Sequence, residues 1–257
     1  MHSALTRSIL ISLLMLASGC LGLHATEDPL PSIETVDPES RHDSVIIMLP
    51  GRGDRGDTFI KQGFHKAGQR FGFDTIAVDA HFAYYMQRSL LPRLHEDVVL
   101  PAREAGYKNV WLLGISMGGF GSLLYAAEYP GMIDGLILLA PFLGEQDAIE
   151  QVLANGGLAS WDAENSQLED YEIAVWSWLH ETTKLPANTP IILGFGLSDG
   201  MAEGLRVLTE VIPPARVYTR EGGHEWTTWG PLWEQIAADL EFSGSGVAEH
   251  GMHGRIP

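Results

Sequence analysis

The sequence predicts an α/β protein with a mostly parallel sheet and helices on both faces. Short apolar runs bounded by turn residues alternate with longer amphipathic segments, which is the pattern of strands connected by helices. The runs are rich in Val, Ile and Leu and do not alternate strictly, as is typical of strands buried on both faces. The chain has 257 residues, 45% of them hydrophobic and 19% charged. It can therefore bury the core of one full domain, or at most of two small ones.

The first twenty residues have the pattern of an export signal. A basic Arg7 precedes an apolar run over residues 9–16, and small residues follow up to Cys20. The apolar run is too short to span a bilayer. The ending Ala17-Ser18-Gly19-Cys20 resembles the lipobox of bacterial lipoproteins, in which cleavage before the cysteine leaves a lipid-modified amino terminus.

That resemblance implies a signal peptide at 1–19, a lipid anchor on Cys20 and attachment to a membrane of the bacterial envelope. Leu21 after the cysteine indicates the outer membrane or its periplasmic face. The alternative is an ordinary secretory signal in which Cys20 is incidental, and the protein is then periplasmic or secreted.

Composition predicts the domain boundaries. Residues 20–43 are polar and spaced by prolines, which indicates a tether, although the alternation over 32–36 leaves an edge strand as an alternative. The folded domain is expected over 44–241. Residues 242–257 are rich in Gly and Ser and are expected to form a flexible tail.

The elements of the domain follow in order from the positions of the apolar runs, and a sheet of about six to eight strands is expected. The predicted strands are Val45–Leu49, Thr75–Val78, Val110–Ile115, Leu136–Leu139, Ile191–Phe195 and Val217–Thr219. The predicted helices are 58–71, 92–105, 117–128 and 227–241.

A serine follows the third predicted strand in a G-x-S-x-G pattern, Gly114-Ile115-Ser116-Met117-Gly118. The pattern describes a nucleophile elbow, a tight turn from strand to helix that needs small residues around the serine. A second match, around Ser198, also follows a strand. It leaves too few residues for a following acid and histidine, so Ser116 is the predicted nucleophile.

With this elbow, the chain resembles the α/β-hydrolase superfamily over roughly 44–241. The resemblance implies the α/β-hydrolase fold and a catalytic triad in the order serine, acid, histidine. Asp199 follows the penultimate strand and His224 follows the last one, so the predicted catalytic residues are Ser116, Asp199 and His224. Asp147 is a rival acid, because some hydrolases carry it after the preceding strand.

The expected oxyanion hole has two backbone donors. The first is the N–H of Met117, and the second, from the loop after the first strand, is the N–H of Arg52. Members of the superfamily usually carry His-Gly in that loop, whereas this chain has Pro50-Gly51.

The segment 142–189 is longer than one crossover helix requires. In hydrolases such an insertion is often a cap, and Trp176 or Trp178 is then expected to approach the acyl pocket. The alternative is a crossover helix that buries these residues against the sheet. Three later tryptophans, Trp226, Trp229 and Trp233, recur at helical spacing, and packing in the core is the better explanation for them.

Charge and composition exclude several classes of partner. The chain has 33 acidic and 16 basic side chains, a formal net charge of −17, which repels nucleic acid. One cysteine permits no internal disulfide and no zinc site with several thiolates. His81, Asp79 and His95 lack metal-ligand spacing, and His250 and His253 lie alone in the tail, so neither a metal nor a cofactor is expected.

The sequence therefore predicts a serine hydrolase that cleaves an ester, thioester or amide through an acyl-enzyme, with a carboxylesterase as the first expectation. Its substrate would be a small-molecule or lipid acyl compound. One alternative is an acyltransferase with the same residues. Another is a non-catalytic lipoprotein that binds a lipid or peptide in the same cleft.

Overall fold

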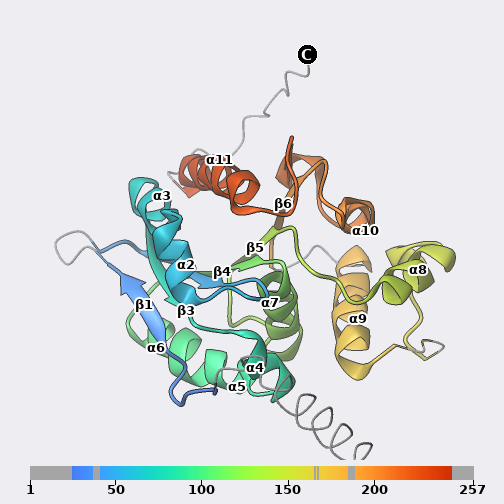
Figure 1. Cartoon of the computed structure of the whole chain (residues 1–257), viewed down its shortest axis with the longest axis horizontal. Helices are drawn as coiled ribbons and strands as arrows, with labels where there is room; N and C mark the ends of the chain where they lie inside the picture. Colours follow the sequence, from blue (N-terminus) through green and yellow to red (C-terminus); the bar gives the residue numbers. More distant parts are fainter. Residues whose placement is uncertain (1–24, 37–40, 165, 167, 185–188, 245–257) are drawn as a thin grey trace, which may run out of the picture.

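A computed structural model describes residues 25–36, 41–164, 166, 168–184 and 189–244. Its centre is a seven-stranded sheet in the order β1-β3-β2-β4-β5-β6-β7 (Figure 1). The strands are β1 (Ser32–Thr35), β2 (Ser44–Leu49), β3 (Phe73–Val78), β4 (Asn109–Ile115), β5 (Gly135–Leu139), β6 (Ile191–Gly196) and β7 (Val217–Arg220). Strand β1 pairs with β3 antiparallel, and all other pairings in this sheet are parallel. The predicted mostly parallel sheet is confirmed.

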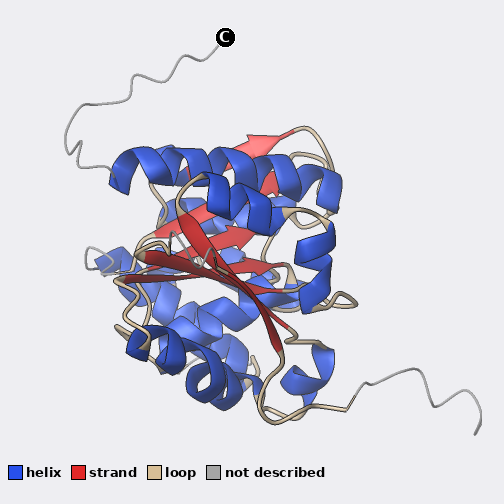
Figure 2. Cartoon of the chain, turned by 90° about the vertical axis from the view of Figure 1, so that its left-hand side faces the viewer, coloured by secondary structure: helices blue, strands red, loops and turns tan. Residues whose placement is uncertain are grey.

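Helices cover both faces of the twisted sheet (Figure 2). One layer contains α2 (Gly56–Lys61), α3 (Phe64–Arg70) and α11 (Trp226–Gly244), and the opposite layer contains α5 (Leu90–Leu94), α6 (Leu100–Glu104), α7 (Met117–Glu128) and α9 (Asp170–Lys184). A π-helical turn, His95–Val99, joins α5 to α6. Three short helices lie at the ends of strands or in the insertion: α4 (Phe82–Met86), α8 (Gln146–Ala154) and α10 (Ala202–Leu205). Single 3₁₀ turns occupy Leu158–Ser160, Arg206–Glu210 and Pro214–Arg216.

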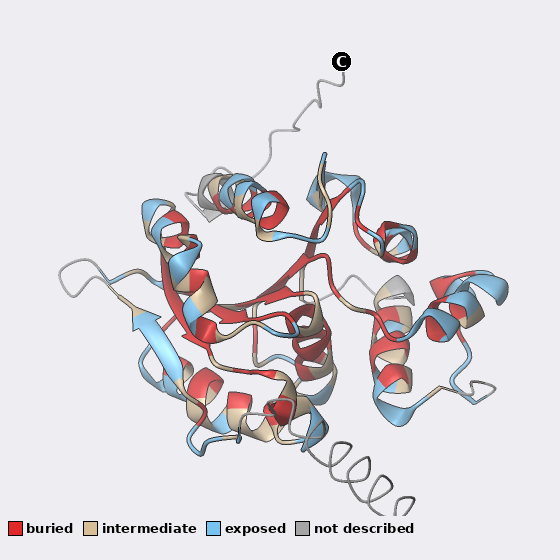
Figure 3. Ribbon diagram, viewed as in Figure 1, coloured by how far each residue is buried: buried red, intermediate tan, exposed pale blue. Residues whose placement is uncertain are grey.

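The strands in the middle of the sheet form the core. Every residue of β3, β5 and β6 is buried, as are all but the first of β2 (Figure 3). Two helical layers remove both faces of these strands from water, so both faces must be apolar. Burial of both faces is therefore the physical cause of the unbroken apolar runs in the sequence.

The order of the strands determines where a site can form. The chain runs outward from β2 to β3, then returns to place β4 on the other side of β2. At such a switch point the loops after the two neighbouring strands diverge and leave a crevice at their carboxyl ends. Leu49 at the end of β2 pairs in register with Gly114 near the end of β4. The loop after β2 and the serine turn after β4 are therefore neighbours.

Two of the predicted helices differ from the structure. The expected helix 58–71 is two helices, α2 and α3, because Gly63 adopts a left-handed conformation (φ 78°) that ends the first one. The expected helix 92–105 is a continuous helical run from Leu90 to Glu104 that includes the π turn. The helix at 117–128 is confirmed. The last helix continues to Gly244, into the predicted tail.

The folded domain begins before the predicted start at Ser44. Strand β1 lies within the predicted tether, as the alternation over 32–36 had left open. Leu30 is buried, and its N–H donates to the Asp97 carboxylate at 2.8 Å. The signal peptide, Cys20 and the histidines 250 and 253 lie outside the described residues. In the described part of the chain, no helix has the length and apolarity needed to cross a membrane.

The insertion between β5 and β6 contains α8 and α9. Helix α9 packs along α7, and the Trp176 side chain on α9 is fully buried, 6.4 Å from the ring of Trp161. These contacts are those of a crossover helix, whereas Trp178 is only partly buried. Trp229 and Trp233 are buried in the core, as their spacing predicts.

Candidate active site

The turn after β4 holds Ser116 in a strained conformation. Ser116 has φ 51° and ψ −115°, a region that L-residues rarely occupy and that costs about 1–3 kcal/mol. Backbone hydrogen bonds on both sides hold it: the Ser116 N–H donates to Leu139, and the Ser116 carbonyl accepts from Phe142 and Gly119. The side chain is half-buried. Such strain, maintained by neighbouring bonds, is the geometry of a nucleophile elbow.

Close backbone packing explains the glycines of this turn. A Cβ added at Gly118 would lie 2.1 Å from the Leu49 carbonyl oxygen, and one at Gly114 would lie 2.3 Å from the Gly118 oxygen. Helix α7 therefore starts directly against the end of β2. Only residues without a side chain allow this approach.

Asp199 and His224 are joined by a hydrogen bond. Asp199 Oδ2 is 2.8 Å from His224 Nδ1, and the Asp199 side chain is 1% exposed against 32% for His224. Asp199 Oδ1 accepts the Met201 N–H at 2.9 Å, so the carboxylate also caps the turn that leads into α10.

The surroundings of Asp199 favour its charged form. Burial acts to raise the pKa of the carboxyl, but the hydrogen bonds from His224 and Met201 and the charge of His224 outweigh it. The pKa of Asp199 is therefore lower than its ordinary value. A carboxylate in this state fixes the imidazole tautomer with the proton on Nδ1, which leaves Nε2 free to accept a proton.

Main-chain contacts hold the two loops together. The Leu197 N–H donates to Arg220, and the Ser198 N–H donates to Gly222, so the loop after β6 is bonded to the loop after β7. A Cβ at Gly196 would lie 2.3 Å from the Gly222 oxygen. The orientation of Asp199 toward His224 thus depends on two backbone segments in direct contact.

The structure does not join all three predicted triad residues. Ser116, Asp199 and His224 follow β4, β6 and β7 at the carboxyl edge of the sheet. In the described residues, no hydrogen bond links the Ser116 hydroxyl to His224. In enzymes without substrate this bond is often long and tightens only when substrate binds.

The two rival residues have other surroundings. Asp147 is exposed in the first turn of α8 and bonds to the neighbouring backbone N–H. Ser198 is exposed and precedes a turn into α10.

His81 is buried against Tyr84, with 4.9 Å between the ring centroids. No cluster of metal ligands occurs in the described residues.

The loop after β2 lies against Ser116. A Cβ at Gly51 would be 3.4 Å from the Ser116 Cβ, which places the backbone at Gly51 and Arg52 beside the serine. Met117 follows Ser116 as the first residue of α7, and its carbonyl accepts the Tyr85 hydroxyl at 3.0 Å. Met117, the first predicted oxyanion donor, is thus the next residue in the chain after Ser116, and Arg52, the second, lies in a loop that contacts Ser116.

Known structures resemble this chain along most of its length. Est1E from Butyrivibrio proteoclasticus, solved with ferulic acid bound, is 17% identical with a TM-score of 0.60, over 83% of this chain and 94% of that one. A protein of Thermoplasma acidophilum described as a predicted CIB-like hydrolase is 19% identical with a TM-score of 0.55, over 81% of this chain and 90% of that one. FphF, a fluorophosphonate-binding serine hydrolase of Staphylococcus aureus, is 12% identical with a TM-score of 0.56, over 85% and 96%.

The chain has the α/β-hydrolase fold. The family model described as serine aminopeptidase, S33, matches residues 94–215, a span that includes Ser116 and Asp199 and ends before β7 and His224. No curated protein matches the chain in sequence.

Two side-chain contacts near Ser116 and His224 were not predicted from the sequence. Tyr85 reaches the elbow from α4, and its burial raises the pKa of the hydroxyl, which keeps it a donor. Partial burial raises the pKa of the Asp54 carboxyl, and the side chain of Trp226, two residues after His224, acts to lower it. The Trp226 side chain, at the start of α11, is therefore close to the loop after β2. The aromatic residues near His81 were the available signal for Tyr85, whereas nothing in the sequence pairs Asp54 with Trp226.

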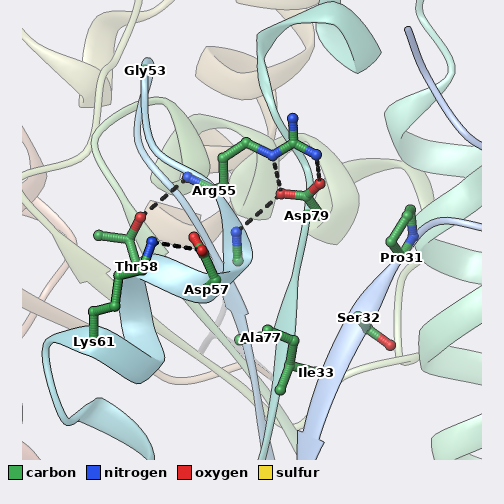
Figure 4. A pocket seen from close by; sticks show the side chains of 11 residues that line it. Pro31, Ser32, Ile33, Gly53, Arg55, Asp57, Thr58, Lys61, Ala77 and Asp79 are labelled. Atoms are coloured by element: carbon green, nitrogen blue, oxygen red, sulfur yellow. Dashed lines mark hydrogen bonds and ion pairs between the residues drawn. The ribbon is translucent and has the colours of Figure 1, made fainter. Parts of the chain in front are cut away.

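A groove of about 610 Å³ opens on the other side of the same loop, between α2 and the edge strand β1 of the hydrolase fold. Arg55 and Asp79 lie within it as an ion pair, with Arg55 Nε donating to Asp79 Oδ1 at 2.8 Å (Figure 4). Ser116 does not line this groove. Asp79 also accepts the Gly56 N–H at the start of α2, so this carboxylate joins the end of β3 to α2.

Proposed function

We propose that the protein is a serine hydrolase, most simply a carboxylesterase, with Ser116 as nucleophile, His224 as general base and acid, and Asp199 as the carboxylate that orients His224. One observation carries this proposal: a buried carboxylate bonded to a half-exposed imidazole lies at the same sheet edge as a serine in a strained elbow. The resemblance to a fluorophosphonate-binding serine hydrolase supports it.

The chemistry follows from these three groups. The Ser116 oxygen attacks the carbonyl carbon of the ester while His224 Nε2 takes the hydroxyl proton. The tetrahedral intermediate collapses, the bond to the alcohol oxygen breaks, and His224 returns the proton to the departing alcohol. Water then attacks the acyl-enzyme, His224 takes one of its protons and gives it back to Ser116, and the carboxylic acid leaves.

The negative charge that develops on the carbonyl oxygen requires donors already in position. The backbone N–H groups of Met117 and Arg52 are the proposed donors. Tyr85 holds the Met117 carbonyl and thereby fixes the orientation of the first turn of α7. Loss of one such donor typically costs about two to three orders of magnitude in kcat.

Two other functions use the same cleft. An acyltransferase would pass the acyl group to an acceptor other than water. A non-catalytic lipid- or peptide-binding lipoprotein has no need of a buried carboxylate bonded to a histidine, and the bond between Asp199 and His224 favours the enzyme.

The test is hydrolysis of p-nitrophenyl esters of increasing acyl length by the purified protein. Ser116→Ala should abolish hydrolysis, and His224→Gln should lower kcat by at least about three orders of magnitude. Ser198→Ala is the matched control, since it removes the other serine in a G-x-S-x-G pattern and should retain activity. A Ser116→Ala variant that is folded and fully active would exclude the proposal.

We also propose that the mature protein begins at Cys20 and is held by lipid at an envelope membrane. The support is the signal-peptide pattern and the lipobox resemblance of the first twenty residues. A lipid anchor would keep the enzyme at a membrane surface, where lipid acyl substrates occur, without a spanning helix.

A further inference from the structure

Arg52 lies in the loop after β2, which contacts Ser116. It follows Gly51, whose added Cβ would lie 3.4 Å from the Ser116 Cβ, and its side chain is exposed. Its guanidinium carbon lies 4.6 Å from the centroid of the Phe82 ring. The charge is therefore held over an aromatic face, which limits the positions that the long side chain can take.

Helix α4 fixes the position of this stacked guanidinium relative to the elbow. Phe82 and Tyr85 are three residues apart, so they share one face of α4. Tyr85 donates to the Met117 carbonyl, and Phe82 lies under Arg52. One helical face therefore contacts both the first residue of α7 and the Arg52 side chain, within about one turn, or 5 Å of rise.

The Arg52 charge has no carboxylate partner among the described residues. Two nearby carboxyls are engaged elsewhere: Asp79 pairs with Arg55, and Asp54 interacts with the side chains of Trp226 and Thr58. A guanidinium stacked on a ring still has its N–H donors available in its plane, arranged for two parallel bonds to a carboxylate. In a chain of net charge −17, an exposed cation next to the serine turn is a feature that attracts an anion locally.

We propose that Arg52 is a specificity-determining residue that binds a carboxylate on the substrate, so that the preferred esters are those with a free carboxylate near the scissile bond. This inference rests on the proposed esterase function. The Arg52 backbone N–H would bind the oxyanion while its side chain binds the distant charge.

The experiment compares kcat/KM for matched anionic and neutral esters. For a carboxylate on the acyl side the pair is mono-p-nitrophenyl suberate and its methyl ester, in which the longer chain keeps the carboxylate from attacking its own ester. For a carboxylate on the alcohol side the pair is 3-carboxyphenyl butyrate and phenyl butyrate. The wild type should prefer the anionic member of one pair, and which pair responds identifies the side on which the carboxylate lies.

Arg52→Gln should reduce that preference, expressed as the ratio of anionic to neutral kcat/KM, by about three- to tenfold, the range expected for a partly solvated charge-assisted contact. Arg52→Lys, which keeps the charge without the planar fork, should retain part of the ratio. Arg216→Gln is the charge-matched control, because Arg216 is exposed at the opposite end of β7.

The two proposals fail differently. A wild type that hydrolyses the neutral esters with equal or better kcat/KM, or an Arg52→Gln ratio unchanged within about twofold, overturns the carboxylate site and leaves the esterase intact. No hydrolysis of any of the four esters by the folded wild type overturns the esterase proposal itself.

Discussion

At the scale of single residues, the proposed catalysis depends on the surroundings of three side chains, Ser116, Asp199 and His224. Ser116 is held in a conformation of positive φ by bonds to Leu139 and Phe142, and Asp199 is held as a carboxylate by His224 and Met201. The strain and the buried charge each cost free energy, which backbone hydrogen bonds offset at Ser116, and the bonds from His224 and Met201 offset at Asp199. A fold that needed none of this chemistry could relax both.

Asp199→Asn is the residue-scale prediction. The amide can donate to His224 and stabilise the wrong imidazole tautomer, so kcat on p-nitrophenyl esters should fall by at least about two orders of magnitude, with little change in KM. The measurement is steady-state kinetics, with Asp147→Asn as the matched control because Asp147 is exposed on α8. Equal losses in both variants would contradict the assignment of the acid.

The same variant has a pH signature. Because the folded-state pKa of Asp199 is below its unfolded value, the carboxylate contributes stability fully above the ordinary aspartate pKa of about 3.9. That contribution is lost as pH falls from there through the folded pKa. The difference in free energy of unfolding between wild type and Asp199→Asn should therefore shrink below about pH 4. A difference that grows there would contradict the lowered pKa.

At this scale the sequence allowed Ser116, Asp199 and His224 to be proposed as a triad, because each follows a strand that the sequence predicts and the order of the strands along the chain is visible. Two contacts could not be predicted from the sequence: the hydrogen bond from the Tyr85 hydroxyl to the Met117 carbonyl, and the interaction of the Trp226 side chain with the Asp54 carboxyl. Those contacts depend on how α4 and the start of α11 pack, and neither helix position follows from local pattern alone.

At the scale of elements, the strands were predictable because burial on both faces imposes unbroken apolar runs, as in β2 and β5. The break between α2 and α3 was missed because Gly63 lies inside an amphipathic pattern, and only its left-handed conformation ends the helix. The sequence does not decide between a tether and a strand at β1, because an edge strand of four mostly exposed residues has little hydrophobic pattern.

Gly118→Ala tests the contact of α7 with β2. The added methyl group would lie 2.1 Å from the Leu49 carbonyl oxygen, so we expect a loss of stability of about 3 kcal/mol or more, measured by urea unfolding. Gly230→Ala is the control: it lies within α11, and an added Cβ would meet nothing within 4 Å apart from its chain neighbours. Because Pro231 follows it and opposes the gain in helix propensity, the change in stability should stay below about 1 kcal/mol. A neutral Gly118→Ala would show that the helix start is not tightly packed.

At the scale of the whole molecule, the switch in strand order at β2 and β4 explains why the loop after β2 and the serine turn meet at one crevice. The sequence predicted the α/β class, whereas the order of the strands follows from long-range pairing that no local pattern contains.

Lipid modification of Cys20 is the prediction that concerns the whole chain. Expressed in a bacterial host with lipoprotein processing, the mature protein should carry diacylglycerol on Cys20 and fractionate with membranes, and Cys20→Ala should be released in soluble form. Intact-mass analysis measures both. An unmodified wild type in a host that processes other lipoproteins would exclude the anchor.

The most direct measurement for the central claim is peptide mapping of the adduct formed when the folded protein reacts with a fluorophosphonate. We expect one modified peptide, with the phosphonyl group on Ser116, and no labelling of Ser116→Ala or of heat-unfolded protein. Modification of Ser198 instead, or none at all on a folded chain, would contradict the claim that the elbow serine is the activated nucleophile.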